Sequence, residues 1–257
     1  MAFPADWLTP DWPAPDRVRA VCTTRFGGES LPPFDSLNLG DHVGDAAAAV
    51  AANRARFARA LQARPVFLKQ VHGQHTAALN TDTADGIEAD GCVSMAPRVA
   101  CTIMVADCLP VLFTCKQGRA VGAAHAGWRG LAGEGGRDIL SSVRVRFRAV
   151  SGASDEQMLA WLGPCIGPDA FEVGPEVKAV FEARDPAAGA LFKPHGPGKW
   201  LADLPGLARQ RLRALGITNV YGNDGGSGWC TVTSVSRFFS HRRDRISGRF
   251  AASIWLT

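Results

Sequence analysis

The stretch RVACTIMVADCLPVLFTCKQGRAVGAAHA, residues 98–126, decides the fold class. It contains three apolar segments in quick succession, 98–108, 110–115 and 119–126, in which hydrophobic residues run continuously. Continuous apolar runs, unlike alternating ones, are typical of strands that are buried on both faces. The stretch therefore predicts strands at the centre of the domain, covered on both sides.

Further strands and helices are predicted on both sides of this stretch. Strands are expected at 17–25, from residue 65 onward, and at 86–94, 158–167, 217–222 and 249–256. Helical patterns cover 46–63, 130–150, 174–184 and 201–216. We expect Asp45 to cap the first helix and Pro205 to fix the start of the last. No repeat or linker is visible, so we predict one domain, residues 1–257, of the α+β or mixed α/β class.

One long segment separates the first predicted strand from the first predicted helix. Residues 26–45, FGGESLPPFDSLNLGDHVGD, have the composition of a loop. A loop of about 20 residues inside a compact domain is unusual and is more often functional than not.

Composition excludes several classes of protein. The chain has 257 residues, of which 46% are hydrophobic and 20% are charged, so a folded core is expected and disorder is not. The net charge of +4 is mild and the basic residues are scattered apart from HRRDR at 241–245, which argues against a nucleic-acid partner and allows an anionic small molecule. No apolar run approaches ~18 residues and the N-terminus lacks the pattern of a secretory signal, so we expect a cytoplasmic protein without a membrane span.

Three residues with metal-ligand side chains follow or end predicted strands. They are His72 in KQVHG, Cys108 in VADCLP and His125 in AAHAGWRG. Side chains at the junctions of strands and loops converge on open crevices. Two imidazoles and one thiolate suit Zn²⁺ and leave a fourth position open, as in catalytic zinc sites, and the same set would accept copper.

The same residues allow two other interpretations. Without a metal, Cys108 could be a nucleophile and His125 its base, with backbone amides near Gly127 or Gly130 as an oxyanion hole. Alternatively, Cys108 is a core residue and the histidines lie hydrogen-bonded at the surface. The seven cysteines form no CxxC pair, and most are expected to be free thiols.

The residues beside His125 favour a bound anion. Gly127 and Gly130 permit tight turns or close approach of the backbone. Arg129, next to a predicted helix start, could join the helix N-terminus in holding phosphate, although a solvated arginine is the alternative. Trp128 could form the wall of a pocket or belong to the core.

The ordered motifs of the chain resemble the laccase-domain family. Its members have been called multicopper polyphenol oxidases, peptidoglycan editing factors and purine nucleoside phosphorylases. The similarity extends over nearly the whole chain. The motifs are TTRFGG at 23–28, SLNLGDHVGD at 36–45, Asn53–Arg54, KQVHG at 69–73, ADCLP at 106–110, HAGWRG at 125–130, GPCIGPDAFEVG at 163–174 and FFSHRRD at 238–244.

The resemblance implies a fold, a metal and an activity. The fold would be a single α+β domain in which mixed β-sheets pack as a sandwich flanked by helices. Zinc would be held by His72, Cys108 and His125. The expected activity is phosphorolysis of adenosine, inosine and methylthioadenosine, with deamination of adenosine as a second reaction, so the partners would be a purine nucleoside and phosphate.

Roles for other residues follow from the same resemblance. Asp107 is the nearest carboxylate in sequence to Cys108 and a candidate acid or base; its alternative role is to hold the adjacent turn. We expect Phe171 to stack on the purine, with Phe26 and Trp128 as alternatives. Asn38 and Arg54 are expected to contact ribose, base or phosphate, together with Arg129. Cys165 and Cys230 are expected to be buried thiols.

Rival functions remain. A copper polyphenol oxidase would need many histidines, often in HxH pairs, and this chain has six histidines and no such pair. The known zinc nucleoside deaminases carry an H-x-E motif, which is absent. A cysteine hydrolase or a regulator in peptidoglycan precursor editing would use the same residues without phosphorolysis. Oligomeric state cannot be predicted from the sequence.

Overall fold

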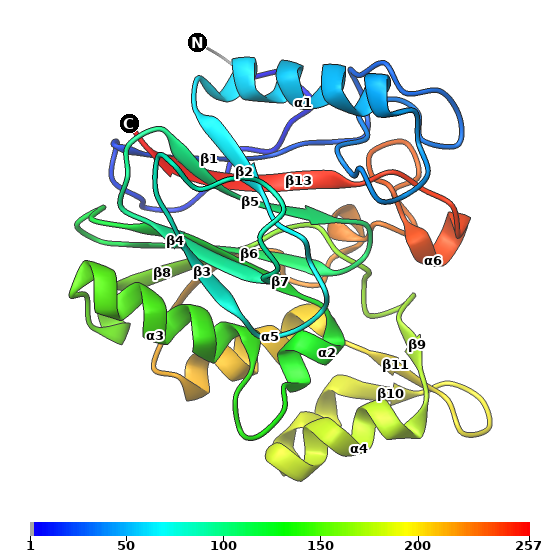
Figure 1. Ribbon diagram of the computed structural model, residues 1–257. Coiled ribbons are helices and arrows are strands. Elements are labelled where there is room, and N and C mark those ends of the chain that lie inside the picture. Colours follow the sequence, from blue (N-terminus) through cyan, green and yellow to red (C-terminus); the bar gives the residue numbers. More distant parts are fainter. Residues whose placement is uncertain (1–2) are drawn as a thin grey trace.

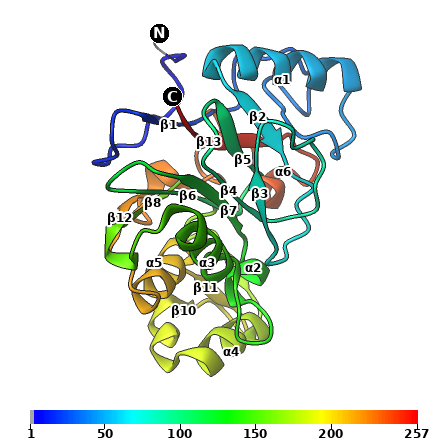
Figure 2. The same cartoon turned by 60° about the vertical axis from the view of Figure 1, so that its left-hand side comes forward.

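Two β-sheets pack face to face, and helices cover both outer faces. The computed structural model describes residues 3–257. Figure 1 shows α1 (Ala47–Leu61) on the outer side of the first sheet, and α3 (Ile139–Ser151) and α5 (Leu204–Ala214) on the outer side of the second. The view of Figure 2 shows the same layers from a second direction. The predicted α+β fold with sheets flanked by helices is confirmed.

The first sheet has the strand order β1-β13-β5-β2, and the second has the order β12-β8-β6-β7-β4-β3. Both are mixed, because β2 pairs in parallel with β5, β3 with β4, and β12 with β8, whereas the other neighbours are antiparallel. A small third sheet, β10-β11-β9, lies beside α4. The strands are β1 (Val18–Cys22), β2 (Arg64–Phe67), β3 (Thr76–Leu79), β4 (Gly91–Ser94), β5 (Val99–Val105), β6 (Leu109–Cys115), β7 (Val121–Ala126), β8 (Met158–Leu162), β9 (Glu172–Val173), β10 (Phe192–Pro194), β11 (Trp200–Ala202), β12 (Asn219–Gly222) and β13 (Phe250–Leu256). The remaining α-helices are α2 (Trp128–Ala132), α4 (Pro175–Arg184) and α6 (His241–Asp244).

The three apolar segments that decide the fold are strands β5, β6 and β7, and every residue in them is buried. In β5, Cys101 and Ile103 belong to the core between the two sheets, whereas Ala100 and Met104 belong to the core that also contains Phe57 of α1. Both faces of the strand therefore lose contact with water, which explains the continuous apolar pattern.

The chain changes sheets between β5 and β6. Strand β5 belongs to the first sheet and β6 and β7 to the second, so Asp107 and Cys108 form the crossing point. Such a crossing leaves the turn at the edge of the sandwich, where other loops can reach it. This turn is the centre of the site described below.

Helix α1 does not begin as predicted. Ala46 is its N-cap residue, and no side chain caps the helix. The Asp45 carboxylate instead accepts hydrogen bonds from the Ser30 hydroxyl and the Asn38 amide. Asp45 therefore holds the long loop 26–45 in place, and the prediction of a helix cap was wrong.

The predicted helix 130–150 is two helices. Helix α2 ends at Ala132, and α3 begins after Asp138, whose side chain caps it in a capping box with Ser141. Glycines 133, 135 and 136 between them have positive φ angles, a conformation that side chains disfavour. The last predicted helix is confirmed with Pro205 in its first turn. None of the helices over residues 3–257 has the length and apolar composition that crossing a bilayer requires.

Candidate functional site

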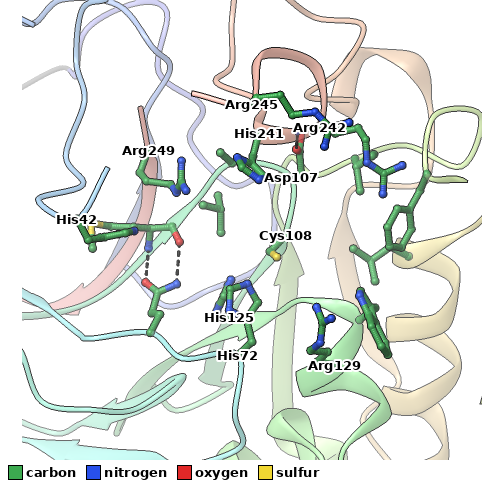
Figure 3. Close-up of a pocket in the computed structure, with 18 residues that line it drawn as sticks. His42, His72, Asp107, Cys108, His125, Arg129, His241, Arg242, Arg245 and Arg249 are labelled. Atoms are coloured by element: carbon green, nitrogen blue, oxygen red, sulfur yellow. Dashed lines mark hydrogen bonds between the residues drawn. The ribbon is translucent and has the colours of Figure 1, made fainter. Parts of the chain in front are cut away.

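His72, Cys108 and His125 lie together at one edge of the sandwich (Figure 3). Their ligand atoms are all within 4.8 Å of one another, and the two imidazole rings are 4.7 Å apart between centroids. Small side-chain rotations would bring these atoms around one ion at Zn–N and Zn–S distances of about 2.0–2.3 Å. Cys108 lies in the turn between β5 and β6, and His125 is on β7. His72 is not at a strand end, as the sequence suggested, but in the loop after β2, with φ 61°.

Asp90 holds two of these three residues in position. Its buried carboxylate accepts a hydrogen bond from Nδ1 of His125 at 2.8 Å, which leaves Nε2 free to face an ion. The same carboxylate accepts the backbone N–H groups of Val71, His72 and Gly73 at 3.2, 2.9 and 2.7 Å. Sequence reasoning missed Asp90, because an Asp-Gly pair before a strand predicts only a turn.

The charges of Cys108 and His125 stabilise each other in the metal-free protein. Burial raises the pKa of the Cys108 thiol, but the charge of His125 and hydrogen bonds from His125 and His72 outweigh it and lower the pKa to about 6. Burial lowers the pKa of His125, but Cys108 and Asp90 outweigh it and raise the pKa to about 9. At neutral pH the thiol is therefore a thiolate, the form that ligates metals, and binding of an ion would displace the proton of His125.

Gly127 leaves the room that these side chains need. A Cβ atom at this position would lie 2.8 Å from Sγ of Cys108 and 3.4 Å from Cδ2 of His72. The backbone of Gly127, with φ −66° and ψ 164°, is open to any residue, so the glycine is required for space and not for conformation.

Gly127→Ala is therefore expected to weaken zinc binding by about tenfold or more, since the added methyl group displaces the thiolate. Competition with a chromophoric chelator measures the affinity. Gly228→Ala is the control and should leave it unchanged, because nothing lies within 4 Å of the added Cβ and the φ angle of Gly228 is not positive. Equal affinities for Gly127→Ala and the parent protein would contradict the placement of the ion beside Gly127.

A cavity of about 460 Å³ opens beside His72, Cys108 and His125. This volume lies in the range of small-molecule sites. Apolar side chains form one part of the lining, and basic side chains form the other. The lining residues are His42, Gln70, His72, Met104, Val105, Ala106, Asp107, Cys108, His125, Trp128, Arg129, Ile166, Phe171, Leu204, His241, Arg242, Arg245 and Arg249.

Asp107 lies in this cavity but already has two partners. One carboxylate oxygen accepts a hydrogen bond from the Thr231 hydroxyl, and the other accepts the backbone N–H of Arg242, both at 2.6 Å. Asp107 has φ 93°, which is uncommon for a residue with a side chain. These bonds tie the turn before Cys108 to helix α6, which is the alternative role that the sequence left open.

Arg129 and Phe171 also line the cavity, on different elements. The guanidinium of Arg129 lies 4.4 Å from the ring centroid of Trp128 and makes no hydrogen bond or ion pair with residues 3–257. Helix α2 has only five residues, so the helix N-terminus expected to assist Arg129 contributes little. Phe171 is buried, and the guanidinium carbon of Arg242 lies 5.4 Å from the centroid of its ring. Phe26, an alternative for stacking, is outside the cavity lining and 48% exposed.

Asn38 and Arg54 do not reach the cavity. Asn38 is fully buried, and its amide bonds to Gly40, Asp45 and the backbone N–H of Arg249. Arg54 donates to the Leu39 carbonyl, pairs with Asp41 at 3.1 Å and lies 4.1 Å from the ring centroid of Phe67. Both residues therefore organise the long loop, and direct contact of either residue with the substrate stays a prediction.

Five basic side chains of the cavity were not predicted individually. They are His42, His241, Arg242, Arg245 and Arg249. The HRRDR run was noted in the sequence, but basic runs are usually solvated faces. Cys165 and Cys230 are buried, as predicted, and burial raises the pKa of Cys165 well above its usual value.

Residues 19–257 match the family described as multi-copper polyphenol oxidoreductase laccase. The chain belongs to this family. Within the laccase family, it is 49% identical to a Pseudomonas aeruginosa protein named purine nucleoside phosphorylase, over 97% of this chain and 98% of that one. It is 47% identical to purine nucleoside phosphorylase YfiH of Escherichia coli, again over 97% and 98% of the two chains.

Solved structures of similar proteins have the same fold. A Neisseria meningitidis protein superposes with a TM-score of 0.87 at 43% identity, covering 98% of this chain and 99% of that one. YlmD from Geobacillus stearothermophilus superposes with a TM-score of 0.83 at 32% identity, covering 94% and 92%. The resemblance that the sequence motifs carried is thus confirmed.

Proposed function

We propose that the protein is a zinc-dependent purine nucleoside phosphorylase, with deamination of adenosine as a second reaction. The observation that carries this proposal is the position of the His72–Cys108–His125 group in the wall of a cavity that is partly apolar and partly basic. The names of the relatives that are 47–49% identical support the phosphorylase activity.

The donor set favours a single zinc ion over the copper centres that the family's description suggests. Two imidazoles and one thiolate are a set that catalytic zinc sites use, with one position left for water or substrate. Among residues 3–257, this is the one group of three or more His, Cys, Asp or Glu side chains close enough to hold an ion. A multicopper oxidase needs several metal sites. When bound, zinc would supply a Lewis acid for a substrate oxygen or a water molecule.

The protein's own residues would orient the substrates around this centre. The buried ring of Phe171 offers a face for the purine, and Trp128 and Ile166 add apolar surface. Arg129, whose guanidinium has no hydrogen-bond or ion-pair partner among residues 3–257, would bind an oxygen of ribose or phosphate. Asp107 faces the same space, and its bonds to Thr231 and Arg242 would keep the turn rigid while substrate binds.

The proposal predicts the products formed from inosine. Phosphorolysis should give hypoxanthine and ribose 1-phosphate, at a rate that rises with phosphate and saturates. Chromatography of the products at varied phosphate measures this, and adenosine as substrate shows deamination by the appearance of inosine. Free ribose, formed at a rate indifferent to phosphate, would instead identify a nucleoside hydrolase.

A metal-free cysteine hydrolase is the second candidate. Cysteine nucleophile sites combine a thiolate, a base and a third group that orients the base. Cys108, His125 and Asp90 offer these three groups, since the Asp90 carboxylate accepts a hydrogen bond from Nδ1 of His125. The two functions differ in what the Cys108→Ala variant retains.

A further inference from the structure

Arg249 carries an unused hydrogen-bonding edge into the cavity. Its Nη1 donates to the backbone carbonyls of Ser247 and Gly248 at 2.9 and 3.1 Å, with the Ser247 hydroxyl at 3.4 Å. Its Nε and Nη2 atoms make no hydrogen bond with any residue from 3 to 257, and none of the acidic side chains in that range lies within ion-pair distance. In Figure 3 the guanidinium lies near His42 and His241, on the opposite side of Cys108 from Arg129.

The long loop fixes Arg249 in this position. The backbone N–H of Arg249 donates to Oδ1 of Asn38 at 2.8 Å, and its carbonyl accepts from Leu39 at 2.9 Å. The side-chain stem passes over Gly40, where a Cβ would come within 2.8 Å of Cγ of Arg249. Asn38, Leu39 and Gly40 thus form a support for this arginine, which makes the guanidinium pre-organised.

A partly buried guanidinium that has no ion-pair partner favours a bound anion. Burial lowers the pKa of Arg249, and the more distant charges of Cys108 and Asp107 offset this only in part. A bidentate pair with an oxyanion satisfies the free Nε–Nη2 edge in the geometry that arginine prefers. The Asp107 carboxylate does not form this pair, because its oxygens accept hydrogen bonds from the Thr231 hydroxyl and the backbone N–H of Arg242.

We propose that the Nε–Nη2 edge of Arg249 anchors a subsite for a phosphoryl oxyanion. This inference rests on the proposed function, in which phosphate is the second substrate. It places the phosphate at Arg249, on the opposite wall of the cavity from Arg129. In phosphorolysis an oxygen of the bound phosphate bonds to C1′ as the C1′–N9 bond breaks. The electron pair leaves with the purine, which takes up a proton. The same chemistry of recognition would fit the phosphate group of a nucleotide.

Direct binding of inorganic phosphate to the zinc-loaded protein tests the assignment. Isothermal titration should show one phosphate per chain. Arg249→Gln is expected to raise the phosphate Kd by about 10- to 100-fold, the value of a lost charge-assisted pair. Arg249→Lys should recover part of the affinity, because lysine keeps the charge and lacks the fork. Arg56→Gln removes the same charge from an exposed position on α1, outside the cavity lining, and should change the Kd by less than about threefold.

The outcomes separate the inference from the proposed function. A Kd for phosphate that is equal in Arg249→Gln and the parent protein, or that rises as much in Arg56→Gln, overturns the subsite. Phosphate binding that depends on Arg249 without nucleoside cleavage supports the subsite and refutes the phosphorylase. Nucleoside cleavage with a KM for phosphate that is the same in Arg249→Gln and the parent protein supports the phosphorylase and refutes the subsite.

Two further arms complete the test. If the parent protein binds adenosine monophosphate, but not inorganic phosphate, and Arg249→Gln loses that binding, the oxyanion is the nucleotide's phosphate group. If Arg249→Gln does not fold, Gly40→Ala displaces the arginine stem without removing its charge and should raise the same Kd. An unchanged Kd in folded Gly40→Ala together with an unchanged Kd in Arg249→Lys contradicts the inference.

Discussion

Cys108→Ala is expected to lose both zinc binding and nucleoside cleavage. The substitution removes the only thiolate among the three ligands, and alanine offers no donor in its place. The loss in zinc affinity should exceed the ~100-fold that removal of an outer-sphere partner costs. The variant is expected to fold, because Cys108 is not fully buried and lies in the turn between β5 and β6. Elemental analysis and inosine turnover on the same sample measure the two effects.

The control for this prediction is Cys115→Ala, at a fully buried cysteine of the core that lies outside the cavity lining. It should keep its zinc and its turnover, although it is expected to be less stable. A Cys108→Ala protein that retains zinc but has lost activity would identify the thiolate as a nucleophile, and the cysteine hydrolase would then replace the phosphorylase.

Asp90→Asn is expected to weaken zinc binding by about 10- to 100-fold while leaving all three ligands in place. Asparagine has the same shape, but its Nδ2 donates. It would face two of the four donors that now point at the carboxylate, because Oδ1 accepts from the N–H of His72 and Nδ1 of His125, and Oδ2 accepts from the N–H groups of Val71 and Gly73. The loop that carries His72 and the ring of His125 would both lose their fixed orientation.

The absorption spectrum of the cobalt-substituted protein reports this effect without turnover. Asp90→Asn should show weaker and altered cobalt–thiolate bands together with the lower affinity. Asp138→Asn is the matched control, because Asp138 is an equally buried carboxylate paired with Arg184 and Arg211 at the start of α3. It should lower stability and leave the cobalt spectrum unchanged. Identical spectra and affinities for Asp90→Asn and the parent protein would show that Asp90 is not a positioning residue.

The sequence predicted the centre of the fold and of the site because both depend on local patterns. Strands β5, β6 and β7 are continuous apolar runs, and Cys108 and His125 lie where these runs meet loops. What the patterns could not show is that β5 leaves β6 and joins the other sheet, where it pairs with β13 from the far end of the chain. Apolar runs are the same whichever sheet buries them.

The residues that the sequence missed act through long-range contacts. Asp90 is separated from His125 by 35 positions, and Arg249 from Asn38 by 211. In the sequence, Asp90 has the signature of a turn, and Arg249 that of a solvated residue before a strand. For the same reason Asn38 and Arg54 were predicted to contact the substrate. In the structure Asn38 bonds to Arg249 and to Asp45 of the long loop, and Arg54 bonds to Leu39 and Asp41 of that loop.

The metal content of the purified protein shows whether His72, Cys108 and His125 hold a zinc ion. Protein prepared without chelator should contain about one zinc per chain by elemental analysis, because three mixed nitrogen and sulfur donors hold one ion and leave one position open. Protein that contains no transition metal, or that holds copper in place of zinc, would show that these three residues do not form a zinc site.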